Sequence, residues 1–255
     1  MSGRRGLSRI VYIMVILSML IFSACSGEGQ RTEADGKALE ETKESEEQDG
    51  SLLSSAPGYG DLAELIDGEA GEYQPYYIRV NRTTNCVTIY ELKEETGQYH
   101  PLKPMICSVG KEGNTPCGDF KLQERYEWRA LFGGVYGQYA VRVVDSILFH
   151  SVPYYKESQD ALKTEEFDKL GTAASDGCIR LQVADAKWIF DSCQAGTVVT
   201  IFDGTTQDDP FPRPEAPVLA DTRYPQWDPS DPIEANPWNG GDGDLSGGEL
   251  FRIWW

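Results

Sequence analysis

Two residues of this chain have the types and setting to attack a carbonyl group together. Cys178 follows Gly177 directly, and His150 ends the apolar run Ile147–Phe149. A free thiol is mostly protonated at neutral pH, so a cysteine nucleophile needs a base within reach. The other histidine, His100, lies in a polar stretch. By elimination and by placement, Cys178 is the candidate nucleophile and His150 is the candidate base.

Each of these residues also has a structural interpretation. Free cysteines are among the most buried residue types, and a histidine at a strand end can be satisfied by local hydrogen bonds. Gly177 favours the catalytic interpretation of Cys178, because glycine permits a tight turn whose backbone N–H groups can point at one spot. An oxyanion hole for acyl transfer needs N–H groups arranged in this way.

The segments that position these residues are predicted to be short strands of one domain, residues 73–203. Tyr76–Val80 and Cys86–Tyr90 are rich in β-branched and aromatic residues, with turn chemistry between them, which predicts a hairpin. Gly97 is expected to open a loop. Further strands are expected at residues 104–110, 139–144, 146–149 and 197–202, and residues 114–122 are expected to form a turn that leads into a strand. Frequent strands favour a mainly β fold, a β-sandwich or barrel with one or two short helices.

One helix is expected after the nucleophile, because apolar residues there recur near helical spacing and Gly196 follows as a suitable stop. The apolar residues are Leu181, Ala184, Trp188, Ile189 and Cys193. Cys193 is therefore expected to face the core.

The segments outside this domain differ in composition. Residues 26–57 are acidic and lack aromatic residues, which predicts a disordered linker, with a solvated helix over residues 38–47 as the alternative. Residues 204–255 are rich in proline, aspartate and tryptophan and predict an extended tail. Trp227 and Trp238 are candidates to hold that tail on the domain.

The N-terminus resembles a bacterial lipoprotein signal peptide, residues 1–25. Three arginines precede the apolar run Ile10–Phe22, which at about 1.5 Å per residue is too short to span a hydrocarbon core of roughly 30 Å comfortably. Small residues then lead to Cys25, the expected lipidation site. The protein is therefore expected outside the cytoplasm, anchored to the cell membrane by lipid and facing the cell wall. The alternative is cleavage at a nearby small residue and release of a secreted protein.

The net charge of −18 argues against a nucleic-acid partner, because phosphate binding needs a basic surface. The chain has no C-x-x-C motif and only two histidines, so no metal and no cofactor are expected.

Apart from Cys25 and Cys178, four cysteines remain: Cys86, Cys107, Cys117 and Cys193. They allow three complete disulfide pairings, and buried free thiols are the alternative.

The residues around the candidate nucleophile resemble the L,D-transpeptidase catalytic domain, the YkuD family. The resemblance lies in Ser175-Asp176-Gly177-Cys178-Ile179-Arg180-Leu181 together with the upstream Phe149-His150-Ser151. Residues 115–120, Thr-Pro-Cys-Gly-Asp-Phe, resemble the family's T-P-x-G-x-F turn. The resemblance covers about residues 76–203.

This resemblance implies peptidoglycan cross-linking. Cys178 would attack the donor tetrapeptide stem after its third residue, release D-alanine and form a thioester that an acceptor stem amine resolves. His150 would be the base and then the acid, Ser151 would orient its imidazole, and the N–H groups of Gly177 and Cys178 would stabilise the oxyanion. Contacts to the substrate are expected from Ser175, Asp176, Arg180 and Tyr154. For Arg180, a structural role in holding the loop is the equal alternative.

Two features depart from the family pattern. Asp176 stands where the family often has histidine, and its charge should raise the pKa of the Cys178 thiol if the two groups are close. The spacing from His150 to Cys178 is longer than the compact family pattern. Residues 154–171 are therefore expected to form a lid or helical insert, with Tyr154 and Tyr155 in the wall of the cleft or simply packed.

Three functions remain open. The favoured one is a monomeric, lipid-anchored L,D-transpeptidase that acts on donor and acceptor stem peptides of peptidoglycan. The same site with water as acceptor would be an L,D-carboxypeptidase or cysteine amidase. A wall-binding lipoprotein with a structural thiol is the third.

Overall fold

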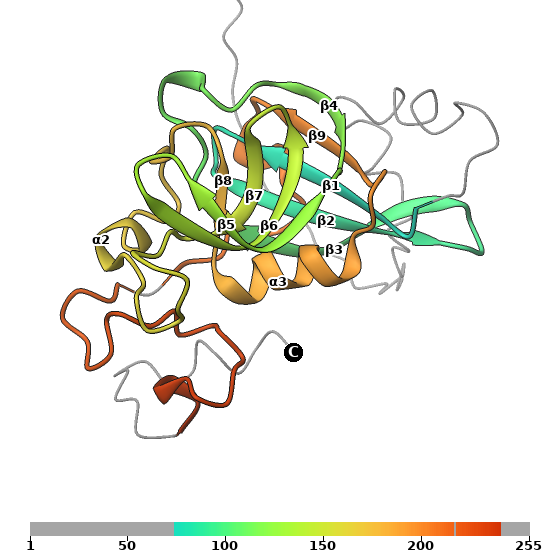
Figure 1. Ribbon diagram of the computed structural model, residues 1–255. Coiled ribbons are helices and arrows are strands. Elements are labelled where there is room, and N and C mark those ends of the chain that lie inside the picture. Colours follow the sequence, from blue (N-terminus) through green and yellow to red (C-terminus); the bar gives the residue numbers. More distant parts are fainter. Residues whose placement is uncertain (1–73, 217, 241–255) are drawn as a thin grey trace, which may run out of the picture. The chain divides into compact units, whose positions relative to one another are not determined.

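The computed structural model describes residues 74–216 and 218–240. The predicted signal peptide, Cys25, the acidic linker and the end of the tail lie outside the described residues. Within the described part, the fold is mainly β, with two sheets and few helices (Figure 1), which confirms the fold class expected from the sequence.

The first sheet has five strands in the order β3-β2-β1-β9-β4. Its strands are β1 (Tyr76–Asn81), β2 (Cys86–Lys93), β3 (Gln98–Ile106), β4 (Gly118–Lys121) and β9 (Val198–Phe202). The predicted hairpin is confirmed, because β1 and β2 pair antiparallel with Tyr77 opposite Tyr90. The last strand returns beside the first, since β9 runs parallel to β1.

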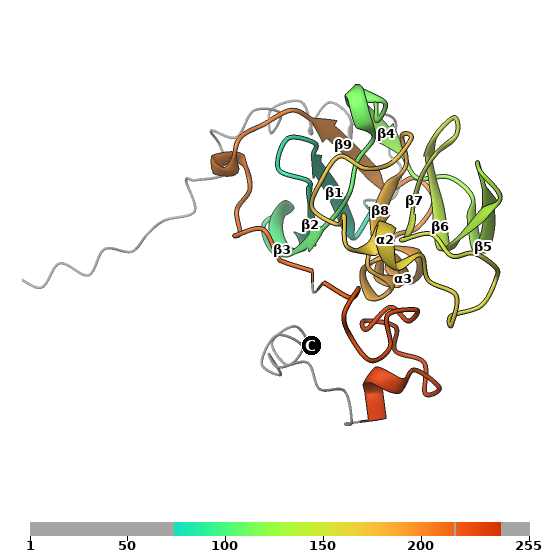
Figure 2. The ribbon, with the colours of Figure 1, turned by 90° about the vertical axis from the view of Figure 1, so that its left-hand side faces the viewer.

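The second sheet has four strands in the order β5-β6-β7-β8. They are β5 (Arg125–Leu131), β6 (Val135–Val144), β7 (Ile147–Ser151) and β8 (Ile179–Leu181). The two sheets face one another, and their inner side chains share one hydrophobic core (Figure 2). The candidate nucleophile immediately precedes β8, and the candidate base lies on its neighbour β7.

Helix α3 (Val183–Ser192) follows the nucleophile, as predicted, and packs on the second sheet. The predicted apolar face was partly wrong, because Leu181 lies in β8 and Ala184 and Trp188 are only partly buried. The buried face of α3 carries Val183, Ala186 and Ile189, and Cys193 just beyond it is fully buried in the core, as expected. Gly196 follows in the left-handed region at φ +93°, where glycine is favoured. The other described α-helix is the single turn α2 (Thr164–Phe167), within the insert between β7 and β8.

Three strand predictions were incomplete. Strand β8 was not predicted, because only three residues form it and Arg180 interrupts its apolar residues. Strand β5 was missed, because most of its residues are partly or fully exposed and its sequence lacks a continuous apolar run. Strand β3 begins at Gln98, where a loop was expected after Gly97, because its first half is polar and lies in an exposed hairpin arm.

The described part of the tail docks on the domain. It has little regular structure beyond the 3-10 turns η3 (Thr206–Asp208) and η4 (Pro237–Gly240), yet Leu219, Asp228 and Asn236 are buried. Trp238 packs against the core, as the sequence suggested, and its ring meets Tyr224 edge-on, with ring centroids 5.6 Å apart. In Figures 1 and 2 this segment runs below α3 and α2.

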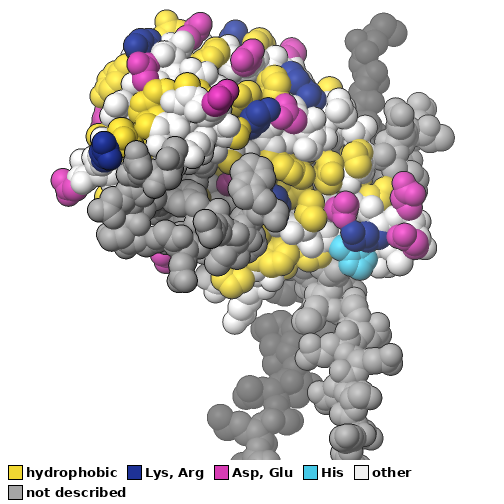
Figure 3. Space-filling view, turned by 90° about the horizontal axis from the view of Figure 1, so that it is seen from below, with side chains coloured by type: hydrophobic (Ala, Val, Ile, Leu, Met, Phe, Trp, Pro, Cys, Tyr) yellow, Lys and Arg dark blue, Asp and Glu magenta, His cyan; other side chains and the backbone are white. Residues whose placement is uncertain are grey.

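Charged side chains of both signs are scattered among apolar ones on the face seen from below (Figure 3). Among the described residues, no helix is long and apolar enough to cross a membrane.

Candidate active site

The pairing of β7 with β8 brings the nucleophile and the base together. The two strands run parallel, with His150 opposite Arg180. Cys178 lies in the bend just before β8, two residues before Arg180, and its thiol contacts the Ser146 carbonyl oxygen, just before β7. Arg180 lies near both residues, and its charge lowers the pKa of His150 and of Cys178.

The imidazole of His150 is buried and oriented by its neighbour. Its Nδ1 lies 2.5 Å from the carbonyl oxygen of Ser151. A carbonyl oxygen only accepts hydrogen bonds, so Nδ1 carries the proton and Nε2 is left as a proton acceptor. Burial and the nearby Arg180 charge lower the pKa of His150 to about 4, against a smaller opposing effect of the Ser151 carbonyl. At neutral pH the imidazole is therefore uncharged and able to accept a proton.

The space for this imidazole is provided by Gly137 on β6. A β-carbon on residue 137 would lie 2.7 Å from Nδ1 of His150 and 2.9 Å from its Cγ. Such distances are well inside van der Waals contact, so any side chain there would displace the ring. The sequence showed Gly137 only as one of several glycines in the region, and no local pattern marked it as part of the site.

Cys178 is half-buried, and its thiol is protonated at rest. Burial is the largest effect and raises the pKa of Cys178; the Leu148 backbone N–H and the Arg180 charge lower it, and the Asp176 charge raises it. The sequence anticipated that Asp176 would raise this pKa, and burial raises it further and by more. The thiol donates to the Ser146 carbonyl oxygen at 3.5 Å. No hydrogen bond joins it to His150 among the described residues, a looseness that is common before substrate binds.

The turn before the nucleophile is held by the hydroxyl of Ser175, which is buried. This hydroxyl accepts the Gly177 N–H at 3.0 Å and donates to the Cys178 carbonyl oxygen at 2.5 Å. Ser175 thus braces the turn from inside. The Gly177 N–H is taken up by Ser175, whereas the family resemblance implied that it would face the oxyanion.

Arg180 holds the insert in place. Its Nη1 pairs with Glu166 of α2 at 2.5 Å and donates to the Ala174 carbonyl oxygen at 3.3 Å. Both side chains of the ion pair are largely buried. These contacts match the structural role that was one of the two alternatives for Arg180. Asp176, in contrast, is exposed at the surface of the turn.

The insert between β7 and β8 is packed into the domain at its start. Tyr154 is fully buried, belongs to the hydrophobic core and meets Trp128 edge-on, with centroids 5.3 Å apart. It therefore contributes packing and presents no surface to a substrate in this structure. Tyr155 is the exposed member of the pair, and its hydroxyl donates to Glu165 at 2.7 Å.

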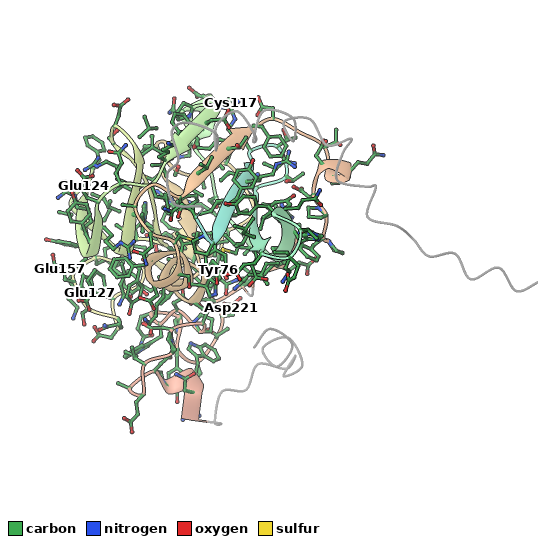
Figure 4. The ribbon with its side chains drawn as sticks, turned by 90° about the vertical axis from the view of Figure 1, so that its right-hand side faces the viewer. Tyr76, Cys117, Glu124, Glu127, Glu157 and Asp221 are labelled. Carbon is green, nitrogen blue, oxygen red and sulfur yellow. The ribbon has the colours of Figure 1, made fainter. Side chains whose placement is uncertain are left out.

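All five described cysteines are free thiols. Cys86, Cys107 and Cys193 are buried, and burial raises the pKa of both Cys86 and Cys193 to about 12. Cys117 is exposed at the surface beside β4 (Figure 4). Buried thiols with such pKa values are poor nucleophiles. Of the two described thiols that are not buried, Cys178 directly precedes the strand that pairs with the strand of the candidate base.

The chain is similar to known L,D-transpeptidases. Residues 75–201 match the YkuD family, described as the L,D-transpeptidase catalytic domain. The Bacillus subtilis (strain 168) protein YciB, whose name gives an L,D-transpeptidase assignment that is itself provisional, is 32% identical over 199 residues. That match covers 74% of this chain and 96% of YciB.

Two solved structures show weaker likeness. A fused Zn-dependent amidase/peptidase/peptidoglycan-binding protein from Clostridium acetobutylicum has a TM-score of 0.41 at 21% identity, covering 61% of this chain and 63% of that chain. An L,D-transpeptidase from Mycobacterium smegmatis has a TM-score of 0.40 at 19% identity, covering 50% and 58%. The chain thus spans less than two thirds of either solved structure. By the family match and the similarity to YciB, this chain belongs to the L,D-transpeptidase (YkuD) family.

Proposed function

We propose that this protein forms peptidoglycan cross-links as an L,D-transpeptidase, with Cys178 as the nucleophile and His150 as the general base. The observation that carries the proposal is that Cys178 directly precedes β8, the parallel neighbour of the strand that carries His150, and that the Ser151 carbonyl orients the imidazole. An oriented base beside a thiol is the arrangement that acyl transfer through a thioester requires.

In the first half-reaction, Sγ of Cys178 bonds to the carbonyl carbon of the third residue of a donor tetrapeptide stem. The thiol proton passes to Nε2 of His150, which returns it to the amine of the departing D-alanine as the C–N bond breaks. In the second half-reaction, an amine of an acceptor stem attacks the thioester. Its proton passes through His150 to the thiolate, which restores the resting enzyme.

The electrostatics of the site favour a neutral resting pair. The pKa of Cys178 is raised and that of His150 is lowered to about 4, so a thiol faces an uncharged imidazole at neutral pH. Proton transfer then accompanies attack on the carbonyl. This differs from cysteine enzymes that rest as a thiolate–imidazolium pair.

We further propose that the protein works outside the cytoplasm, as a monomer held to the membrane by lipid on Cys25. The support is the run of basic, apolar and small residues before Cys25. Metabolic labelling with a fatty acid tests this. Label should appear on the wild-type chain and be absent from Cys25→Ala, and a labelled Cys25→Ala protein would refute the anchor.

The transpeptidase reaction is tested with the full chain and a disaccharide-tetrapeptide, with products resolved by mass spectrometry. Cross-linked dimer is expected from the wild type and none from Cys178→Ala. Free tripeptide without dimer would show that water is the acceptor, and would replace the transpeptidase with a carboxypeptidase. No turnover by a folded wild-type protein would refute both. His150→Ala should fold and fail to form the thioester.

A further inference from the structure

A buried hydroxyl from a distant turn contacts the nucleophile's turn. Thr115 is fully buried, in the Thr-Pro-Cys-Gly turn before β4. Its Oγ1 accepts the Gly110 N–H at 2.7 Å and donates to the Gly177 carbonyl oxygen at 2.6 Å. Both bonds are short and buried, so removing the hydroxyl would leave two buried backbone groups without a partner.

The bond to the Gly177 carbonyl sets the direction of the next N–H. The Gly177 carbonyl and the Cys178 N–H belong to one planar, trans peptide group, so they point in opposite directions. With the carbonyl directed to Thr115, the Cys178 N–H points away from it. This N–H donates to no group among the described residues, whereas the Gly177 N–H is taken up by Ser175. The Cys178 N–H is thus the donor that remains for an oxyanion.

Gly177 makes this peptide group easy to turn. Its φ is +145°, in the region that favours glycine, and glycine tolerates the change in ψ that rotates the following peptide. A side chain at residue 177 would be strained at this φ, and its β-carbon would also lie 2.7 Å from Cδ1 of Ile147 and 3.2 Å from the Asn114 carbonyl oxygen. An external contact is therefore needed to hold the Gly177–Cys178 peptide in one orientation.

Thr115 is itself rigidly placed. Arg82 donates to the Thr115 carbonyl oxygen and pairs with Asp203 at 2.5 Å. On the other side, a β-carbon on Gly110 would lie 2.7 Å from the Thr115 nitrogen and 2.9 Å from the Gly177 Cα. The three backbones are therefore in direct contact, and little movement of the hydroxyl is possible.

We propose that Thr115 is a positioning residue for acyl transfer: its hydroxyl fixes the Gly177–Cys178 peptide so that the Cys178 N–H stabilises the oxyanion. The inference rests on the proposed function of Cys178. It assigns the Thr-Pro-x-Gly turn a specific task in the reaction, carried by one hydrogen bond between residues 62 positions apart in the chain.

Two reactions of the Cys178 thiol distinguish stabilisation of the oxyanion from a purely structural role of Thr115 in keeping the thiol in place. Acylation of Cys178 by a carbapenem forms the Sγ–acyl bond, breaks the lactam C–N bond and passes through an oxyanion. Alkylation by iodoacetamide displaces iodide and forms no oxyanion. Both products are followed by intact mass and located by peptide mapping in the full chain.

Thr115→Val keeps the shape and loses the hydroxyl, and Thr115→Ser keeps the hydroxyl. We expect Thr115→Val to slow acylation about 10- to 100-fold with alkylation within about 2-fold of wild type, since loss of a whole oxyanion donor slows such reactions about 10²- to 10³-fold. Thr115→Ser should restore most of the acylation rate. If Thr115→Val does not fold, Thr115→Ala is used, because its smaller side chain strains the turn less.

Equal acylation by the wild type and the folded hydroxyl-free variant would overturn the inference. So would a parallel loss of acylation and alkylation, since that reports a displaced thiol. The proposed function fails in a different way: the wild type itself would then be alkylated at Cys178 but never acylated.

Discussion

The backbone of Gly137 lies against the imidazole of His150, so closely that a β-carbon on residue 137 would come within 2.7 Å of Nδ1. Nδ1 of the ring donates a hydrogen bond to the carbonyl oxygen of Ser151, the next residue on β7. The Ser151 hydroxyl in turn accepts the Gln138 N–H of β6 at 2.9 Å. Strands β6 and β7 therefore hold the base from two sides, by contact and by hydrogen bonding.

Gly137→Ala is expected to disable the base while the domain still folds. The methyl group would push the imidazole away from the Ser151 carbonyl, and a misplacement of about 1 Å can slow a reaction about 100-fold. The rate of Cys178 acylation should fall by that order, with a small loss of stability in thermal unfolding. Gly97→Asn is the matched control, because a β-carbon at Gly97 meets nothing within 4 Å and asparagine tolerates its positive φ. A Gly137→Ala protein with wild-type rates would show that the ring can shift without consequence.

The strand that carries the candidate base could be predicted, because a buried strand leaves a continuous run of apolar residues, here Ile147–Phe149. Strand β8 was not predicted, because only three residues form it and Arg180 interrupts its apolar residues. Strand β5 could not be predicted in this way, since its exposed residues leave no such run. The candidate roles of Cys178 and His150 followed from their residue types and neighbours, the apolar run before His150 and Gly177 before Cys178.

The contacts that orient the site could not be predicted from local sequence. Thr115 reaches Gly177 across 62 positions, and Asp228 reaches Val183 across 45. Each partner is ordinary in its own segment, and only the fold brings the pair together. The occupation of the Gly177 N–H by Ser175 is local, but it depends on the turn's dihedral angles, which the residue types alone leave open.

Acid is expected to destabilise the protein through His150. Its pKa is about 4 in the folded state against an ordinary value of 6.5, so the folded protein binds this proton more weakly than the unfolded chain. The contribution to stability is therefore complete above pH 6.5 and is lost as pH falls towards 4, by at most about 3 kcal/mol. The free energies of unfolding of the wild type and of His150→Asn are measured with denaturant from pH 4 to 8. The difference between the two should become smaller as the pH falls. A difference that does not change with pH would contradict the lowered pKa.

The same pKa predicts the pH dependence of the reaction. Because His150 must be unprotonated to act as a base, kcat/KM should remain high through pH 6 and decline on its acid side only near pH 4. Folded protein at each pH is verified by circular dichroism. An acid limb centred near 6.5 would indicate that the imidazole is solvated in the working enzyme.

Removing the Asp176 charge is expected to make Cys178 slightly more acidic. Asp176 raises the pKa of the thiol, but it is exposed, and burial is the larger cause. Asp176→Asn should shift the pH profile of iodoacetamide alkylation slightly to lower pH, and 1 M salt should shrink the shift because exposed charges are screened. Glu157→Gln, an exposed substitution in the insert, is the charge-matched control (Figure 4). A shift to higher pH would mean that Asp176 acts on the thiol through another group.

Asp228 of the tail is expected to stabilise the helix that follows the nucleophile. Helix α3 has no side-chain cap of its own at Gln182, and Asp228 Oδ2 accepts the Val183 N–H at 2.9 Å while Ser230 Oγ accepts the Ala184 N–H at 3.0 Å. Asp228 is fully buried, so Asp228→Ala should lower the free energy of unfolding by about 1–3 kcal/mol. Asp228→Asn keeps an acceptor oxygen and should lose less. Asp221→Asn, at an exposed tail position, is the control and should not change stability (Figure 4).

The role of Asp228 at the N-terminus of α3 is tested more sharply by measuring how the stability change of Asp228→Asn depends on pH. Burial raises the pKa of Asp228 to about 6, with its hydrogen bonds to Ser230 and Val183 opposing the rise. The folded state therefore holds this proton more tightly than the unfolded chain, and the stabilisation that comes with protonation is lost as pH rises from about 4 to about 6. Asp228→Asn cannot ionise, so its stability relative to wild type should improve across that interval and then level off. Free energies of unfolding that change in parallel for the two proteins from pH 4 to 7 would show that Asp228 is ionised throughout. The helix N-terminus and its N–H donors would then lower the pKa of Asp228 by more than burial raises it.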